Sequence, residues 1–219
     1  MKKIGVLGTG DVGRTLAAGL AGVGHSVMIG TRDPSRDSIL AWQRDDDNAV
    51  QIGTFGEAAA FGDILILAVG WPNVDAVIEL AGDDRFDGKV LLDATNPLRF
   101  EKEGEPPVLD IGHTDSAGEV IQRRLPGARV VKAFNIVGSV HMVQPDFPGG
   151  EPDMFICGDD GQSKQAASEL IESLGWPSPI DLGGIENSRY LESMAMVWIV
   201  HFFNAGFQGT HAFKLLRKQ

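Results

Sequence analysis

The stretch IGVLGTGDVG, residues 4–13, decides the fold that the sequence predicts. It places the pattern G-x-G-x-x-G at Gly8, Gly10 and Gly13, directly after a predicted strand and at the start of a predicted helix. In such a unit the first glycine makes the tight turn, the second lets the backbone approach a pyrophosphate, and the third lets the helix pack closely on the strand. The N-terminus of the helix also offers free N–H groups to phosphate oxygens. The stretch therefore predicts a dinucleotide site; the alternative is a tight turn with a purely structural role.

The rest of the chain alternates short apolar runs with amphipathic stretches. Several of the apolar runs lack polar alternation, which is typical of strands covered on both faces. Thr54 with Glu57, and Ser116 with Glu119, have the spacing of helix capping boxes. This order predicts an α/β fold of the Rossmann type, with a doubly wound, mostly parallel sheet. We expect strands at residues 3–7, 26–30, 49–53, 64–69, 90–93 and 129–132, and helices at residues 11–23, 35–44, 54–61, 73–80 and 116–125.

A second pattern begins at residue 153. It predicts a strand at 154–157, a helix at 162–174 and a short strand at 179–182, which we expect to extend the same sheet. Residues 194–207 are mostly apolar but fall short of the ~18 to 20 residues of a membrane span. They predict a helix that is buried either in its own chain or against a partner subunit. We therefore divide the chain into a Rossmann domain, residues 1–184, and a small C-terminal helical segment, residues 185–219.

Composition and charge exclude several classes of function. Lys plus Arg number 19 and Asp plus Glu number 30 among 219 residues, a net charge of −11. A uniformly acidic protein repels phosphate backbones and anionic lipids, so neither nucleic acid nor membrane is an expected partner. The basic start is interrupted by Asp11 and Arg14, and no signal peptide is expected.

The single cysteine and the scattered histidines argue against a metal site. Cys157 cannot form an intrachain disulfide, which fits a reducing cytoplasm, and we interpret it as a small buried hydrophobe. The five histidines have no metal-ligand spacing, so no metal is predicted. The run Asp45–Asp47 is interpreted as a solvated loop, because a calcium loop needs a longer ligand pattern. We expect a cytoplasmic protein.

The residues after the second predicted strand indicate which dinucleotide binds. An NAD site has a carboxylate here for the ribose 2′-hydroxyl. This chain instead has Thr31 and Arg32, with Arg36 one helical turn further on. A hydroxyl and two guanidinium groups suit a 2′-phosphate, and each charge-assisted hydrogen bond contributes roughly 1.5–3 kcal/mol. NADP(H) is therefore the predicted cofactor; alternatively, the arginines are solvated charges that balance neighbouring aspartates.

Ligands of a doubly wound sheet bind beyond the carboxyl ends of its strands. Hydride transfer between stacked rings requires the reacting atoms about 3–3.5 Å apart in a dry pocket, and no protein nucleophile. We therefore predict no catalytic residue in the strict sense. One cleft is expected from residues 8–12, 69–71, 95–97 and 133–135.

Within that cleft, small and polar residues have different predicted roles. Gly70 and Ala133 would let an acceptor ring lie flat over the nicotinamide. Thr95, Asn96 and Asn135 would form hydrogen bonds with ring edges or with the carboxamide. Each has a structural alternative. Trp71 either forms a cofactor wall or closes a loop over the core. Asn96 also suits a turn before proline, and Asn135 suits a helix cap.

At this point the chain resembles a known family, the NADPH-dependent coenzyme F420 reductases, also called F420:NADP oxidoreductases. It is also similar to the cytosolic reductase domain of the six-transmembrane metalloreductases. The motifs that carry the resemblance extend over nearly the whole chain, and they are Gly8–Gly10, Thr31–Arg32, Trp71, Val131–Asn135, Cys157–Asp160, Asn187–Arg189 and Glu192–Ser193.

The resemblance implies hydride exchange between NADP(H) and a flavin-like ring, with a C-terminal segment that contributes to the acceptor site and to a homodimer. It also implies three groups of cofactor contacts. By this resemblance the 2′-phosphate is contacted by Thr31, Arg32 and Arg36, the pyrophosphate by Thr9, Gly10, Asp11 and Val12, and the nicotinamide by Val69, Gly70 and Ala133.

The chain departs from the family pattern at two places. Gly70 stands where the family often has proline, and Trp71 with Pro72 follows. The segments 93–97 and 132–135 look more like the metalloreductase domain. These departures leave the acceptor open among coenzyme F420, FMN, FAD and another small oxidant.

The leading hypothesis is therefore an NADP(H)-dependent oxidoreductase that passes a hydride between NADPH and a flavin-like acceptor. A second is an NADPH-dependent reductase of a small imine or carbonyl, like the pyrroline-5-carboxylate reductases, which build the pocket from a longer helical domain than residues 185–219. A third is a non-catalytic NADPH sensor.

Overall fold

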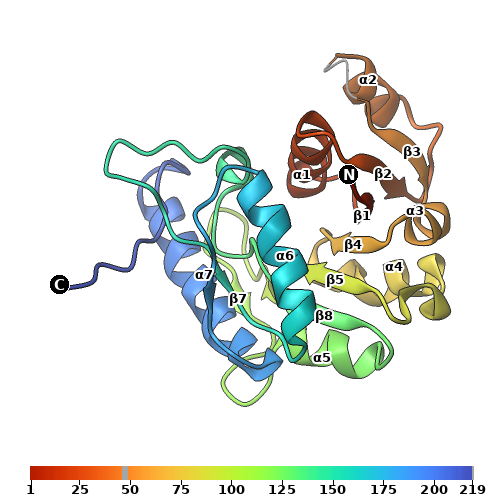
Figure 1. Cartoon of the computed structure of the whole chain (residues 1–219). Coiled ribbons are helices and arrows are strands. Elements are labelled where there is room, and N and C mark those ends of the chain that lie inside the picture. Colours follow the sequence, from red (N-terminus) through yellow and green to blue (C-terminus); the bar gives the residue numbers. More distant parts are fainter. Residues whose placement is uncertain (46–48, 219) are drawn as a thin grey trace.

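The computed structural model describes residues 1–45 and 49–218, and its centre is a six-stranded parallel sheet (Figure 1). The strand order is β3-β2-β1-β4-β5-β8, which is the order of a Rossmann fold, with its reversal between β1 and β4. The predicted strands and their parallel pairing are confirmed. Their bounds are β1 Lys3–Leu7, β2 Ser26–Thr31, β3 Gln51–Thr54, β4 Ile64–Leu67, β5 Val90–Asp93 and β8 Arg129–Lys132.

Helices cover both faces of this sheet (Figure 1). On one face α1 (Asp11–Gly22), α2 (Asp37–Asp45) and α6 (Gly161–Ser173) share a core with alternate strand residues such as Val6. On the other, α3 (Phe55–Phe61), α4 (Val74–Ala81) and α5 (Ala117–Arg124) pack with the residues between them, such as Leu7. Because both faces are buried, the strands need apolar residues at successive positions. The acidic run at 45–47 falls mostly outside the described residues.

Two glycines of the first turn are required by close backbone approach. Gly8 has φ +130°, and a Cβ there would lie 2.2 Å from the carbonyl oxygen of Ala68. A Cβ on Gly13 would lie 2.0 Å from the carbonyl oxygen of Gly8. Any larger residue would therefore push α1 away from the end of β1. This turn fixes the N-terminus of α1 against the reversal point of the sheet.

One predicted capping box is complete and the other is half formed. Thr54 Oγ1 accepts from the Glu57 N–H at 3.2 Å, and Glu57 Oε2 accepts from the Thr54 N–H at 2.7 Å. At α5, the Ser116 hydroxyl accepts from the Glu119 N–H, as predicted. The Ser116 N–H, however, donates to Asp115 and not to the Glu119 carboxylate. The carboxylate of that glutamate is bound by an arginine of α7, which competes for it.

The expectation that the later strands extend the central sheet is wrong. Strands β9 (Phe155–Ile156) and β10 (Ile180–Asp181) form a separate parallel pair. They meet β8 through one antiparallel bridge between Lys132 and Cys157, and this direction cannot continue a parallel ladder. Another small pair, the antiparallel hairpin β6 (Leu98–Arg99) and β7 (Val108–Leu109), follows β5. Short 3-10 helices occur at Trp71–Asn73, Asp83–Phe86, Ser139–His141 and Ile185–Asn187.

The C-terminal segment is built around α7 (Ser188–Asn204), and only one face of this helix is buried. Leu191 and Ala195 pack against β9 and β10. Val197 and Val200 on the same helix are 61% and 39% exposed, so within this chain the helix is half-buried. No helix in the described ranges is long and apolar enough to cross a membrane.

The chain after α7 folds back along the helix before it ends. Trp198 Nε1 donates to the carbonyl oxygen of His211 at 2.8 Å, and the two rings stack with centroids 4.5 Å apart. Phe213 then packs against the cluster of Leu191 and Ala195. Its carbonyl oxygen accepts from the Asp153 N–H at 2.9 Å, and the Leu215 N–H donates to Asp153 Oδ2 at 2.6 Å.

Candidate functional site

Two adjoining cavities lie beyond the carboxyl ends of the central strands. The larger, of about 800 Å³, is lined by the loops after β1, β4 and β5, by the β6–β7 hairpin and by Ser139. The smaller, of about 290 Å³, runs from the glycine turn to the residues after β2. Both include Gly10 and residues 68–70, so they form one continuous cleft at the switch point of the sheet.

The smaller cavity brings together the residues predicted to hold a 2′-phosphate. Thr31 ends β2 and is buried, whereas Arg32 and Arg36 are exposed, and all three line this cavity. Within the described residues neither guanidinium group lies within 4.0 Å of a carboxylate oxygen. The Asp33 carboxylate instead accepts from the Ser35 N–H at 3.0 Å and from its hydroxyl, and these hydrogen bonds lower the pKa of Asp33.

The turn between the cavities has room for a phosphate group. Gly10 caps α1 with φ −74° and ψ −179°, and no other part of the protein lies within 4 Å of where its Cβ would be. Its backbone is thus open to the cleft, in contrast to the tightly packed Gly8 and Gly13. Asp11 and Val12 follow in the first turn of α1 and line the larger cavity.

Two aromatic side chains from different segments of the chain line the larger cavity. Trp71 and Phe100 both line it, and Trp71 Nε1 donates to Asp110 Oδ2 at 3.3 Å. Asp110 also pairs with Arg99, whose Nε lies 3.2 Å from Asp110 Oδ1. The hairpin carboxylate therefore holds both Trp71 and Arg99 at the edge of the cavity.

Thr95 and Asn96, which follow β5, form another wall of the larger cavity. Asn96 Nδ2 donates to the carbonyl oxygen of Asn135 at 2.8 Å, and Asn135 Nδ2 donates to Asn96 Oδ1 at 2.9 Å. Among the described residues, the buried hydroxyl of Thr95 has no hydrogen-bond partner.

The loop at 133–135 is placed differently from the expectation. Ala133 is fully buried and Asn135 lies behind Asn96, and neither lines the two cavities of this cleft. The chain turns away at Phe134, whose φ is +63°. Three of the four predicted segments therefore form the cleft, and the fourth supports it from behind.

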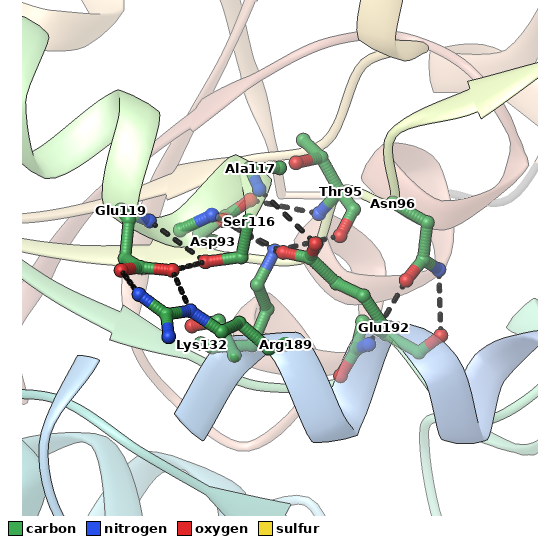
Figure 2. A network of polar contacts seen from close by, with 12 residues as sticks. Asp93, Thr95, Asn96, Ser116, Ala117, Glu119, Lys132, Arg189 and Glu192 are labelled. Carbon is green, nitrogen blue, oxygen red and sulfur yellow. Dashed lines mark hydrogen bonds and ion pairs between the residues drawn. The ribbon is translucent and has the colours of Figure 1, made fainter. Parts of the chain in front are cut away.

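Sequence reasoning missed a cluster of three buried charged residues beside this wall, here called the buried triad: Asp93, Lys132 and Glu192 (Figure 2). Lys132 Nζ lies 2.6 Å from Asp93 Oδ2 and 2.8 Å from Glu192 Oε1. Burial alone would lower the pKa of Lys132, but the two carboxylates outweigh it, and the pKa is raised. Burial also raises the pKa of Glu192, against the opposing effect of Lys132.

Part of the buried triad had a signal in the sequence. Asp93 and Lys132 each end an apolar strand with a charge, and they are register partners on neighbouring strands β5 and β8. Glu192 belongs to one of the motifs of the family resemblance, but nothing in the sequence placed it beside Lys132. It comes from α7, and only the folded chain brings it to the N-terminus of α5, where it accepts from the Ala117 and Gly118 N–H groups.

The sheet order and the glycine turn define the class of the protein as a Rossmann-type dinucleotide-binding protein. Residues 3–97 match the family model described as NADP oxidoreductase, coenzyme F420-dependent. The F420-dependent NADP reductase of Methanothermobacter marburgensis is 35% identical over 207 residues, which are 90% of this chain and 91% of that protein. The chain belongs to this family of NADP-dependent oxidoreductases, as the sequence motifs indicated.

Three further likenesses extend the comparison. A crystal structure from Arthrobacter sp. FB24, provisionally assigned as an F420-dependent NADP reductase, has a TM-score of 0.92 and 38% identity, covering 99% of this chain and 100% of that one. Metalloreductase STEAP3 of Rattus norvegicus is 31% identical over 194 residues, but the chain spans only 36% of its length. A reductive aminase of Aspergillus terreus, with a TM-score of 0.64 and 17% identity, shares the fold alone.

Proposed function

We propose that this protein transfers a hydride between NADPH and a flavin-like acceptor, which is coenzyme F420, FMN or FAD. The observation that carries the proposal is the continuous cleft, with the exposed Arg32 and Arg36 at one end and an apolar cavity of about 800 Å³ at the other. This volume is in the upper part of the range for small-molecule sites. Such a space suits a nicotinamide and a second flat ring together. Two relatives are named F420-dependent NADP reductases, which also supports a flavin-like acceptor.

The residues present fit NADP(H). The space above Gly10, which a Cβ would fill, suits a pyrophosphate at the N-terminus of α1. The unpartnered Thr95 hydroxyl in the cavity wall suits a polar group of the nicotinamide end. When bound, NADPH supplies the hydride.

In this proposal the chain's own residues bind and orient NADPH, and they exclude water from the cleft. Arg32 and Arg36 bind the 2′-phosphate, and residues 8–12 bind the pyrophosphate. Val69 and Gly70, which both cavities share, support the nicotinamide ring. Trp71, held by Asp110, shields the acceptor from water.

We also infer a cytoplasmic homodimer in which residues 185–219 form the interface. The exposed Val197 and Val200 of α7 support this inference, whereas Trp198 is engaged within its own chain by His211. None of residues 185–219 lines the larger cavity, but Phe203 and Phe207 border Phe100 at its edge. Light scattering of the Val197→Glu/Val200→Glu variant tests the interface: we expect a folded monomer, and an unchanged dimer would count against it.

The function is tested by oxidation of NADPH with purified protein and F420, FMN, FAD or a simple imine in parallel. We expect turnover with a flavin-like acceptor and preference for NADPH over NADH. Turnover of the imine alone would favour the small-substrate reductase. Tight NADPH binding without turnover of any acceptor would favour the sensor.

A further inference from the structure

The buried triad binds the main chain of a single cavity residue, Thr95 (Figure 2). Lys132 Nζ donates to the carbonyl oxygen of Thr95 at 2.9 Å, in addition to its contacts with Asp93 and Glu192. Asp93 Oδ1 accepts from the Thr95 N–H at 2.8 Å. Both main-chain polar groups of Thr95 are therefore held by charged side chains.

The environment of this cluster makes a purely stabilising role a poor explanation. Lys132 is fully buried in an apolar strand, between Val131 and Ala133, which are themselves fully buried. Replacing a buried ion cluster by apolar residues of similar volume is often neutral or stabilising, because charges lose much hydration on burial. Apolar residues in place of all three members of the buried triad could not bind the Thr95 main chain.

Glu192 connects this wall to the C-terminal helix. Its carboxylate accepts from the Ala117 and Gly118 N–H groups at 3.0 and 3.1 Å, and it also pairs with Lys132. The N-terminus of α5 favours a negative charge at this place. Helix α7 is thereby joined to Thr95 through only one intervening side chain, Lys132.

We propose that Asp93, Lys132 and Glu192 are positioning residues that hold Thr95 and Asn96 in register with the nicotinamide ring. This rests on the proposed function, in which NADP(H) occupies the cleft. The triad has no contact with the cavity itself: it acts through the Thr95 main chain, which sets where the unpartnered Thr95 hydroxyl lies. A misplacement of about 1 Å in a reacting pair can cost 10²-fold in rate.

The test compares two identical substitutions on the α5–α7 contact. Glu192→Gln neutralises the carboxylate of the buried triad. Glu119→Gln is the matched control, because Glu119 joins the same two helices through Arg189 but does not contact Lys132 or Thr95. Three quantities are measured for each: the thermal midpoint, the dissociation constant of NADPH, and the fluorescence emission of bound NADPH, which reports how the nicotinamide ring is held. Single-turnover hydride transfer is measured with whichever acceptor the wild type reduces.

Both variants are expected to lower the thermal midpoint. Only Glu192→Gln is expected to change the emission of bound NADPH and to slow hydride transfer, by about tenfold to a hundredfold. Its NADPH affinity should stay within about threefold of the wild type, because the phosphates anchor the cofactor at the other end of the cleft. Equal emission and equal transfer rates in the two variants would overturn the proposal.

Thr95→Val covers the case in which Glu192→Gln does not fold. It keeps the main-chain contacts of the buried triad and removes only the hydroxyl, so we expect an unchanged thermal midpoint with altered emission and slower transfer. Wild-type emission and rate in this variant would also overturn the proposal. A wild type that binds NADPH but reduces no acceptor contradicts the proposed function alone, because the emission comparison still decides the role of the triad.

Discussion

Gly10→Ala separates cofactor binding from folding more cleanly than any other change in the cleft. Gly10 has φ −74° and ψ −179°, an extended conformation that alanine also adopts. Among the described residues, apart from Gly10 and its two chain neighbours, no atom lies within 4 Å of the added Cβ. The neighbouring Gly13→Ala is the contrast, because its Cβ would lie 2.0 Å from the Gly8 carbonyl oxygen.

The effect of Gly10→Ala on stability should be small. Loss of chain freedom in the unfolded state stabilises the variant by about 0.4–1 kcal/mol. Alanine is a poorer helix N-cap than glycine, by about 1 kcal/mol. The two effects nearly cancel, so the thermal midpoint should move by no more than about 4 °C in a protein of this size.

The effect on NADPH binding should be large. The added methyl group would occupy the place where the pyrophosphate meets the backbone, and loss of two charge-assisted hydrogen bonds corresponds to roughly 3–6 kcal/mol. The dissociation constant should therefore rise at least about a hundredfold. Isothermal titration and thermal unfolding of the two variants measure both quantities. Wild-type NADPH affinity in Gly10→Ala would refute the reasoning, as would a stable, fully folded Gly13→Ala.

Three further predictions follow from single side chains. Arg32→Asp should weaken NADPH binding by about tenfold to a hundredfold and leave NADH binding nearly unchanged, as judged by titration; an unaltered preference would exclude Arg32 from the phosphate site. Burial raises the pKa of Cys157 to about 11, so its thiol should resist iodoacetamide at pH 8 in the folded protein and react once urea unfolds it; rapid native labelling would contradict this. Arg189 lowers the pKa of Glu119 from 4.5, so this pair stabilises the fold above that pH and loses its effect as the pH falls through the lower, folded value. We expect the free energy of unfolding, measured with urea at stepwise lower pH, to fall less steeply with pH in Glu119→Gln than in the wild type. The same steepness in both proteins would argue against the pair.

Local sequence patterns predicted most of the fold and the grouping of the residues at the smaller cavity. The glycine turn at 8–13 and the apolar strands are short-range patterns, in which each residue's role follows from its neighbours in sequence. The structure accordingly places Thr31, Arg32 and Arg36 together at one cavity, where the residues after the second predicted strand were expected.

The parts that sequence could not supply depend on long-range contacts. Glu192 reaches Lys132 only because α7 packs against α5. The hydrophobic periodicity of the sequence does not predict which helices pack together. The positive φ of Phe134 takes Ala133 behind the cleft wall instead of into it, although the small side chain itself suggested a ring contact. The short strands β9 and β10 had the residue pattern of sheet members, but they pair with each other, and a single antiparallel bridge between Lys132 and Cys157 connects them to β8.

The central claim is that this cleft brings NADPH and a flavin-like ring together for hydride transfer. Single-turnover oxidation of NADPH by the wild-type protein, without oxygen and with F420, FMN or FAD in excess, tests it most directly when NADPH deuterated at the transferred position is compared with ordinary NADPH. The account predicts oxidation with at least one of these acceptors, slower with the deuterated cofactor. Tightly bound NADPH that none of the three acceptors oxidises would contradict it.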